Sequence, residues 1–329
     1  MDKFRTEVKI PSSPYKINHK SGILLIGSCF TENIGTRMAE YKFDVDINPF
    51  GIVYNPMSVN QNLEVILSEK KYVITDLYNH QDSWISLDHH SRFSFPEPEI
   101  CLREINRRIE YSHSRIRTIQ FLIITFGTAW IYKIAGSGKL VSNCHKLPAN
   151  FFDRELLTMD NILAVYKKLI PSLVRLNPGI RIIFTVSPIR HLKDGPVQNT
   201  LSKSTLILTI HELLKSFKCA EYFPAYEIAL DDLRDYRYYE EDMIHPNSQM
   251  TGYIWDKFCQ TYFEDETLKI MKEIGKLNSA LKHKPFRPGT PKHLEFLNNQ
   301  IEFIRTLKQK YPYLNFSDEE ASLEKQLSQ

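Results

Sequence analysis

The sequence predicts an α/β fold in which helices cover both faces of a mostly parallel sheet. Three short segments, 23–26, 121–125 and 180–186, consist almost entirely of apolar residues. Such segments are typical of strands buried on both faces, as parallel strands are when helices cover them. Segments with apolar residues at helical spacing lie between them, and an alternation of strands and helices favours a parallel sheet.

The composition excludes several classes of protein. The chain has 329 residues, a formal net charge of +3, 42% hydrophobic and 25% charged residues, which are ordinary values for a globular protein. Nineteen Phe and seventeen Tyr supply apolar area for a core, so disorder is not expected. The small net charge, with no long basic run in the sequence, argues against a nucleic-acid partner.

The sequence also predicts a cytoplasmic location. No apolar run approaches the ~18 residues that a membrane span requires, and the first ten residues show no apolar stretch of a secretory signal. The five cysteines do not have the Cys-x-x-Cys spacing of a zinc site or a redox pair. We therefore expect free thiols in a reducing compartment.

The first part of the chain predicts a strand, a tight turn and a helix. Alternating apolar and charged residues over 4–10 predict a half-exposed strand, which prolines end. The buried strand 23–26 follows and is bounded by Gly27. A helix is expected directly after Ser28 from the helical spacing of Phe30, Ile34 and Met38.

The same order recurs farther along the chain. The strands 121–125 and 180–186 end at Gly127 and at Ser187. After the first of them, a glycine-containing turn between two apolar segments predicts a β-hairpin over 130–142. Helices are expected over 156–176, 198–217 and 248–263, and a short strand over 220–223. In such folds the ligand site lies beyond the carboxyl ends of the strands.

We predict two units, an α/β domain over 1–265 and a helical extension over 266–329. In the extension, Thr290 followed by Pro291 is typical of a helix start. An apolar stripe at spacings of three and four follows, made of Leu294, Leu297, Ile301 and Ile304. A stripe of this kind most often packs on its own domain. The alternative is that it binds a second copy of the chain and makes a homo-oligomer.

The turn Gly27-Ser28-Cys29-Phe30 carries the first chemical signal. A serine there lies at a strand end that opens a helix, where its own backbone N–H at the helix N-terminus can stabilise a developing oxyanion. The alternative is that Ser28 is simply an N-cap, a common use of serine. Cys29 is expected to be a packed core thiol, because free cysteines are usually buried.

The loop before the last helix of the domain carries the second signal, in the run Asp242-Met243-Ile244-His245-Pro246-Asn247. Histidine is the usual general base near neutral pH and needs a partner on its other ring nitrogen. An aspartate three residues earlier can reach Nδ1 of His245 and leave Nε2 free. The alternative is that both residues cap neighbouring elements. Together the two motifs supply Ser, Asp and His at predicted strand exits.

These two motifs, together with GTAW at 127–130 and SPIRHLKDG at 187–195, make residues 20–260 resemble the GSCFA domain family, which is similar to the SGNH/GDSL hydrolases. The resemblance implies a flavodoxin-like, three-layer α/β/α fold. It also implies that Ser28 is the nucleophile, His245 the general base and Asp242 the acid that orients the base.

The chain departs from the SGNH pattern at the oxyanion site. Those hydrolases carry an asparagine after the glycine of the central strand end, whereas Thr128 follows Gly127 here. Thr128 is one candidate replacement, and the backbone N–H of Gly51 and the side chains of Asn48 and Asn55 are others. The loss of one oxyanion donor can lower a rate by ~10²–10³.

Other polar residues also follow predicted strand exits. His145, Arg190 and His191 are candidates for binding a polar or anionic substrate group, and the alternative is that they pair with surface carboxylates. The adjacent His89 and His90 are not expected to bind a metal, because neighbouring side chains diverge.

We therefore expect a serine esterase or acyl hydrolase that cleaves a small O-acyl ester, such as an acetyl group on a carbohydrate. The reaction would pass through an acyl-enzyme and need no metal or organic cofactor. An acyltransferase could use the same triad. From a different class, the alternative is a binding or scaffolding protein that keeps the fold with weak or no catalysis, and the missing asparagine is its main support.

Overall fold

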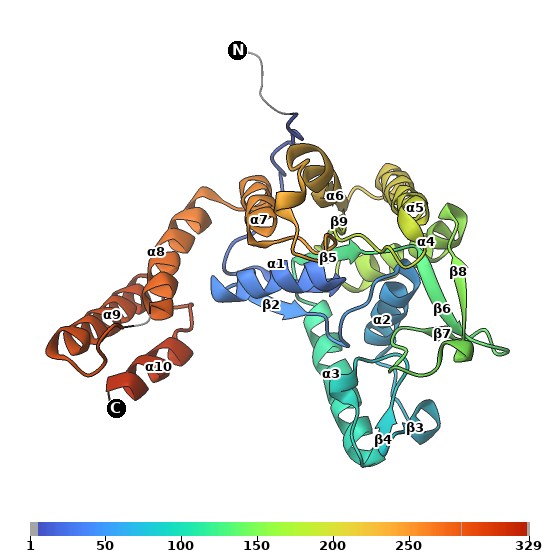
Figure 1. Ribbon diagram of the computed structural model, residues 1–329, viewed down its shortest axis with the longest axis horizontal. Coiled ribbons are helices and arrows are strands. Elements are labelled where there is room, and N and C mark those ends of the chain that lie inside the picture. Colours follow the sequence, from blue (N-terminus) through green and yellow to red (C-terminus); the bar gives the residue numbers. More distant parts are fainter. Residues whose placement is uncertain (1–5, 284, 328–329) are drawn as a thin grey trace.

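The computed structural model describes residues 6–283 and 285–327. Its centre is a sheet with the strand order β10-β9-β5-β1-β2, in which every neighbouring pair is parallel. This is the 2-1-3-4-5 order of flavodoxin-like folds, so the predicted fold is confirmed (Figure 1). The strands are β1 (Gly22–Gly27), β2 (Asp44–Ile47), β5 (Phe121–Phe126), β9 (Arg181–Val186) and β10 (Ala220–Phe223).

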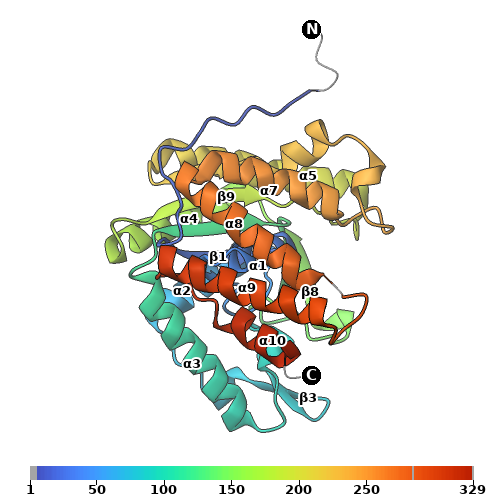
Figure 2. The ribbon, with the colours of Figure 1, turned by 90° about the vertical axis from the view of Figure 1, so that its left-hand side faces the viewer.

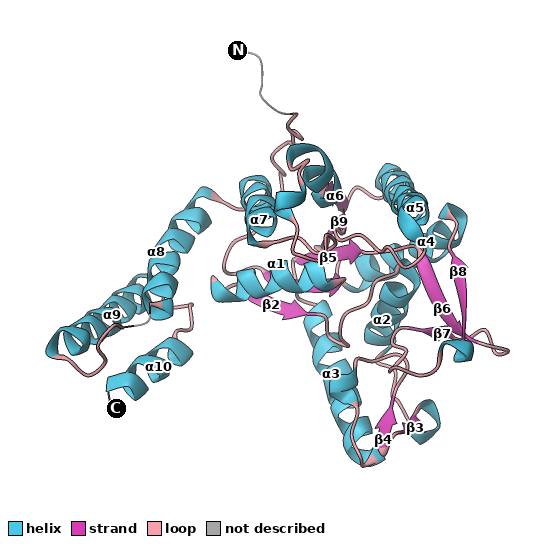
Figure 3. Ribbon diagram, viewed as in Figure 1, coloured by secondary structure: helices cyan, strands magenta, loops and turns pink. Residues whose placement is uncertain are grey.

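Helices cover both faces of the sheet, because neighbouring side chains of a strand point to opposite faces (Figure 3). Ile23 and Leu25 pack in one core cluster, which α1 and α7 complete. Leu24 and Ile26 pack in the other, which α2, α3, α4 and α5 complete. The bounds of these helices are α1 (Cys29–Glu40), α2 (Pro56–Ser68), α3 (Pro98–Ile116), α4 (Met159–Leu176), α5 (Gly195–Ser216) and α7 (Ser248–Tyr262).

A small antiparallel sheet, β7-β6-β8, follows the exit of β5. Its first two strands, β6 (Trp130–Ile134) and β7 (Leu140–Val141), form the predicted hairpin. The third strand, β8 (Phe152–Leu156), was not predicted, and α4 begins after it with Thr158 as its N-cap. The other short elements are η1 (Ile74–Asp76), β3 (Tyr78–His80), β4 (Ser83–Ile85), η2 (Ser91–Phe93), η3 (Ala149–Phe151), α6 (Ala225–Glu227), η4 (Ile228–Asp232) and η5 (Tyr236–Tyr238).

The C-terminal helices have a hydrophobic cluster of their own. They are α8 (Asp265–Lys282), α9 (Pro291–Lys310) and α10 (Ser317–Leu327), and Figure 2 shows them side by side. Leu297 and Ile304 of the predicted stripe are buried in this cluster, which also contains residues of α8 and α10. Lys42 forms an ion pair of 2.5 Å with Glu319 and so joins the extension to the end of α1. The stripe is therefore covered largely within this chain.

The predicted strand over 4–10 is wrong for the described residues 6–10, which form no strand. The N–H of Val8 donates to Asp232 Oδ1 at 2.6 Å, so a side chain, and not a sheet neighbour, satisfies it. The remaining residues of that segment, 4 and 5, lie outside the described part. No helix of the described residues is long and apolar enough to cross a membrane.

The turn after β1 requires glycine at position 27. Gly27 has a φ of +150°, and a Cβ on it would lie 2.2 Å from the carbonyl oxygen of Thr125. Its N–H donates to Asn48 Oδ1 at 2.9 Å, so the buried Asn48 side chain fixes the end of the strand. The exits of β1 and β5 are thus in direct backbone contact.

Hydrogen bonds from a buried lysine join the exits of β5 and β9. Lys203 of α5 is 1% exposed, and its Nζ donates to the carbonyl oxygens of Gly127 at 2.6 Å and Ser187 at 2.7 Å. Its hydrogen-bond partners in the described residues include no carboxylate. Burial lowers the pKa of Lys203 to about 7. Lys203 precedes the buried Leu206 and Ile210 by three and seven residues, so the helical spacing itself indicates a buried position.

We predict that Gly27→Ala lowers the free energy of unfolding by about 3 kcal/mol, because the added methyl group clashes with the Thr125 carbonyl and the backbone is strained. Gly179→Ala is the control, since the nearest atom to an added Cβ there is 3.7 Å away. Urea unfolding followed by circular dichroism measures both. Equal midpoints for the two variants would contradict the prediction.

We also predict that the unfolding free energy of the wild type rises relative to that of Lys203→Met as the pH rises from about 7 towards 10.5. The folded state lowers the pKa of Lys203 from 10.5 to about 7, so only the unfolded state binds the proton in this window. The difference in unfolding free energy then grows by at most about 1.4 kcal/mol per pH unit. Lys215→Met, at an exposed position of α5, is the control. A difference that stays constant with pH would refute this.

Candidate active site

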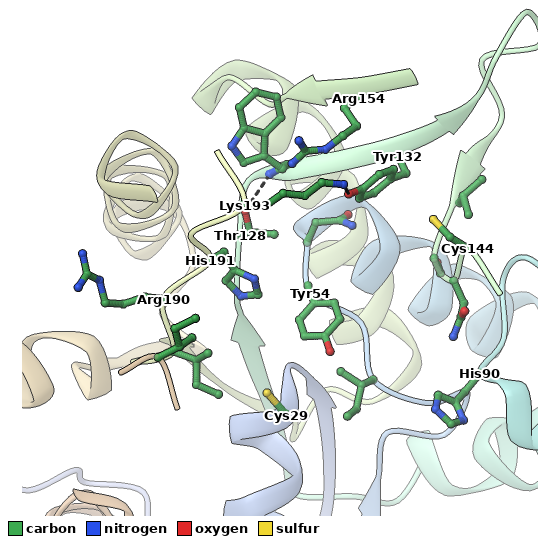
Figure 4. Close-up of a pocket in the computed structure, with 18 of the residues that line it drawn as sticks. Cys29, Tyr54, His90, Thr128, Tyr132, Cys144, Arg154, Arg190, His191 and Lys193 are labelled. Carbon is green, nitrogen blue, oxygen red and sulfur yellow. Dashed lines mark hydrogen bonds between the residues drawn. The ribbon is translucent and has the colours of Figure 1, made fainter. Parts of the chain in front are cut away.

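A cavity of about 560 Å³ opens beyond the carboxyl ends of the strands, where such folds bind their ligands. Residues from the start of α1, from the exits of β5 and β9 and from the loop before α7 line it. The small sheet contributes Trp130, Tyr132 and Arg154 (Figure 4). Segments that are far apart in the sequence therefore meet at this edge of the sheet.

The predicted contact between Asp242 and His245 is confirmed. Asp242 Oδ2 lies 2.5 Å from His245 Nδ1, and Oδ1 accepts the backbone N–H groups of Ile244 and His245 at 2.9 Å each. These bonds, led by that to the His245 N–H, lower the pKa of Asp242 to about 2. His245 lines the cavity with its side chain 52% exposed. The pair is thus a carboxylate and an imidazole, with Nε2 not bound to the carboxylate.

Ser28 is held as an N-cap. It is 0% exposed, and its Oγ accepts the N–H of Phe30 at 3.3 Å. Its own N–H donates to the Thr125 carbonyl at 3.3 Å. Ser28 is not among the residues that line the cavity, and in the described residues no hydrogen bond joins it to His245. The capping alternative therefore describes its contacts.

Cys29 differs from its expected place in the core. It is half-buried and packs against the cluster beneath α1, but it also lines the cavity together with His245. In Figure 4 it lies at the start of α1, below His191 and Tyr54. Burial raises the pKa of the Cys29 thiol, while the N–H groups at the helix start and Lys203 act in the opposite direction. The thiol of Cys29, one residue after the predicted nucleophile Ser28, therefore lines the cavity.

The backbone groups considered as oxyanion donors are already engaged. The N–H groups of Gly127 and Thr128 donate to the Tyr54 carbonyl at 2.7 and 3.0 Å, and that of Gly51 donates to the Asn48 carbonyl at 2.9 Å. Thr128 lines the cavity, but its Oγ1 lies 3.0 Å from Ser202 Oγ. These hydrogen bonds hold the loops at the strand exits in place.

The two asparagines considered as replacements have different places. Asn48 is buried with Oδ1 on the N–H of Gly27, and it is not a lining residue. Asn55 lines the cavity, but both ends of its amide contact Ser58, where it caps α2. The Asn55 amide is thus engaged at both ends, whereas Nδ2 of Asn48 is buried without a hydrogen-bond partner.

The other predicted binding residues are brought to the cavity only in part. Arg190 and His191 line it, whereas His145 does not. His145 Nε2 lies 2.8 and 2.9 Å from the carbonyl oxygens of Ser86 and His89 and holds that turn. Figure 4 shows His191 turned towards Tyr54 and Arg190 turned away from it. Burial lowers the pKa of His191 to about 4, so this imidazole is neutral at pH 7.

The adjacent histidines separate as expected. His89 is 1% exposed and packs among aromatic rings, while His90 lines the cavity. Within residues 6–283 and 285–327, no group of three or more His, Cys, Asp or Glu is arranged to hold a metal ion.

Several lining residues were not predicted from the sequence. Tyr54 follows an irregular loop, and Lys193 and Arg154 flank the ring of Tyr132, with the charged groups 5.3 and 5.2 Å from its centre. Arg154 also forms an ion pair with Asp194, in which Nη2 donates to Oδ2 at 2.7 Å. Lys193 stands in the SPIRHLKDG stretch, whereas Tyr54 and Arg154 stand in none of the motifs above, so the fold was needed to find those two.

The comparisons with known proteins give one strong and several weak similarities. The chain matches the model of the GSCFA family over residues 22–258 and that of the GSCFA domain protein, C-terminal domain, over residues 274–329. No curated protein matches it.

Two solved structures are similar at a low level. One is a carbohydrate esterase family 3 from Talaromyces cellulolyticus, with 10% identity, a TM-score of 0.35, and coverage of 78% of this chain and 99% of that chain. The other is a family two carbohydrate esterase from Clostridium thermocellum in complex with cellohexaose, with 13% identity, a TM-score of 0.32, and coverage of 81% and 68%. Similarity this low carries no argument about function. The family models cover most of the sequence, and the chain belongs to the GSCFA family.

Proposed function

We propose that the protein is an acyl hydrolase that cleaves a small O-acyl ester, such as an acetyl group on a carbohydrate, through a covalent acyl intermediate. The observation that carries this proposal is the Asp242–His245 pair at the cavity, with the start of α1 in the same cavity wall. A carboxylate fixed on Nδ1 selects the tautomer whose Nε2 accepts a proton, and it stabilises the imidazolium that results.

In this mechanism the attacking group comes from the turn at the start of α1. Ser28 is the residue that the family resemblance implies, and Cys29 is its neighbour. The attacking group transfers its proton to His245 Nε2, adds to the ester carbonyl and expels the alcohol, which takes the proton. Water then releases the acyl group by the same steps in reverse order.

The oxyanion would be stabilised at the helix N-terminus. Cys29 occupies the first position of α1, where a backbone N–H has no partner within the helix. The partial positive charge of the helix start acts on the same point. This support does not depend on the asparagine that SGNH hydrolases carry, since the N–H belongs to the backbone.

The charges of the cavity favour a substrate with an anionic group. Its lining contains the cations Arg154, Arg190 and Lys193, and the described lining contains no Asp or Glu. Asp194 offsets the charge of Arg154, while Nζ of Lys193 donates to the Tyr132 hydroxyl at 2.9 Å. A carboxylate or phosphate near the ester would thus meet uncompensated positive charge.

We predict that His245→Ala lowers kcat for p-nitrophenyl acetate by about 10²–10⁴, because the general base is lost. Asp242→Asn lowers it as well, since the imidazole loses its orienting charge. His293→Ala, in α9, is the control and keeps the wild-type rate. Steady-state release of p-nitrophenol measures all four proteins. Wild-type rates in both site variants would sink the hydrolase proposal, and a wild type without turnover would favour the binding protein.

We also predict that 4-acetoxybenzoate has a higher kcat/KM than its methyl ester at low ionic strength. Lys193→Gln lowers this preference by about three- to fivefold, in line with one partly exposed charge pair. Added salt acts in the same direction. Lys215→Gln, remote from the cavity, is the control. An unchanged preference in Lys193→Gln would exclude Lys193 as the anion-binding group.

A further inference from the structure

We propose that Cys29, and not Ser28, is the nucleophile, so that the covalent intermediate is a thioester. This inference rests on the acyl-transfer function proposed above and assigns the residue that performs it. Four observations support it, which concern access, the role of Ser28, the electrostatic surroundings of the thiol and the choice of base.

Ser28 and Cys29 differ in their access to the cavity. Ser28 is 0% exposed and is not a lining residue, whereas Cys29 is half-buried and lines the cavity with His245. Consecutive side chains at a helix start point in directions about 100° apart, which is consistent with one of the two facing the cavity. A substrate that enters the cavity therefore meets the thiol.

Ser28 also has a structural task that disfavours attack. Its Oγ accepts the N–H of Phe30, and its N–H donates to the Thr125 carbonyl. Rotation of Oγ towards the cavity would leave the first turn of α1 without its cap, at a cost of about 1 kcal/mol. The cap of α1 is Ser28 and not Cys29, so the Cys29 thiol can turn to a substrate without loss of the cap.

Some groups around Cys29 raise the pKa of its thiol, and others lower it and so favour the thiolate. Burial and the carboxylate of Glu32 raise the pKa of the thiol. The N–H groups of Cys29 and Phe30 and the buried Lys203 lower it. A helix N-terminus and a nearby cation are the features that make protein thiols nucleophilic. The thiol can also be deprotonated during attack by the base.

His245 is the base that fits this role. His191 lies in the same cavity, but its Nε2 is buried without a hydrogen-bond partner and it has no carboxylate on its ring in the described residues. His90 uses Nδ1 to accept the N–H of Arg92 at 3.2 Å. Of the described histidines that line the cavity, His245 is the one with an orienting carboxylate. Contacts between nucleophile and base often tighten when substrate binds.

The step balances as follows. The proton of the Cys29 thiol moves to His245 Nε2, and the sulfur forms a bond with the acyl carbon while the carbonyl electron pair moves to oxygen. The tetrahedral intermediate expels the alkoxide, which takes the proton from the imidazolium. Water, deprotonated by His245, then adds to the thioester, and the thiolate leaves and is protonated.

The first experiment compares the two residues directly. Each protein is mixed with p-nitrophenyl acetate, quenched in acid and analysed by intact mass and peptide mapping. We expect one acetyl group on Cys29, removed by neutral hydroxylamine as a thioester is. We expect Cys29→Ala to lose the adduct and at least 10² of kcat, while Ser28→Ala keeps the adduct and a rate within tenfold. Ser28→Asn, which retains a capping oxygen, replaces Ser28→Ala if that variant melts early.

An acetyl group on Ser28, or turnover that survives in Cys29→Ala, would overturn the assignment while the hydrolase function stands. The second experiment needs no ester. Cys144 lines the same cavity, is half-buried and lies far from the helix start, so it is the matched control thiol. We expect iodoacetamide at pH 7 to alkylate Cys29 at least tenfold faster than Cys144, and His245→Ala to reduce the ratio. Equal rates in the wild type would overturn the proposal even if esters are hydrolysed.

Discussion

The geometry of the site depends on the direct contact between the exits of β1 and β5. Gly27 approaches the Thr125 carbonyl so closely that no side chain fits between them, and the N–H of Ser28 donates to that same carbonyl. The helix α1 therefore begins at once, with no linker in which the chain could turn. This contact fixes the direction of each side chain in the first turn. It buries Ser28 and turns Cys29 to the cavity.

The buried lysine extends this constraint to the third strand exit. Lys203 binds the carbonyl groups of Gly127 and Ser187, which end β5 and precede the loop with Arg190 and His191. It places a titratable cation behind the cavity, where its charge acts on Cys29 and His191. The carboxylate of Asp242, about half exposed, lies at Nδ1 of His245.

Much of the fold follows from the sequence, because buried parallel strands and amphipathic helices leave strong patterns. The apolar runs around Leu24, Ile123 and Ile183 predicted the three central strands. The edge strand β2 has only four residues, two of them aspartates, so its pattern is too short to recognise. The segment 6–10 alternates like a strand but finds no neighbour. The alternation of polar and apolar residues indicates which side chains prefer water. It does not show whether a neighbouring strand is present for hydrogen bonding.

The site was predictable where contacts are local. Asp242 and His245 are three residues apart, and a turn with Met243 at a φ of +58° joins them. The choice between Ser28 and Cys29 was not, because it depends on the angle at which α1 leaves β1, which the contact with β5 sets. The same holds for Gly127 and Thr128, whose N–H groups donate to the Tyr54 carbonyl of a distant loop.

At the exit of β5, where SGNH hydrolases carry an asparagine, the backbone N–H groups of Gly127 and Thr128 both donate to the Tyr54 carbonyl. In the proposed mechanism, the charge that develops on a carbonyl oxygen is therefore stabilised by the start of α1. A thiolate suits the proposed arrangement, because the N–H groups of Cys29 and Phe30 and the buried Lys203 lower the pKa of Cys29. In the proposed mechanism, one helix N-terminus therefore activates the attacking sulfur and stabilises the negative charge that develops on the carbonyl oxygen.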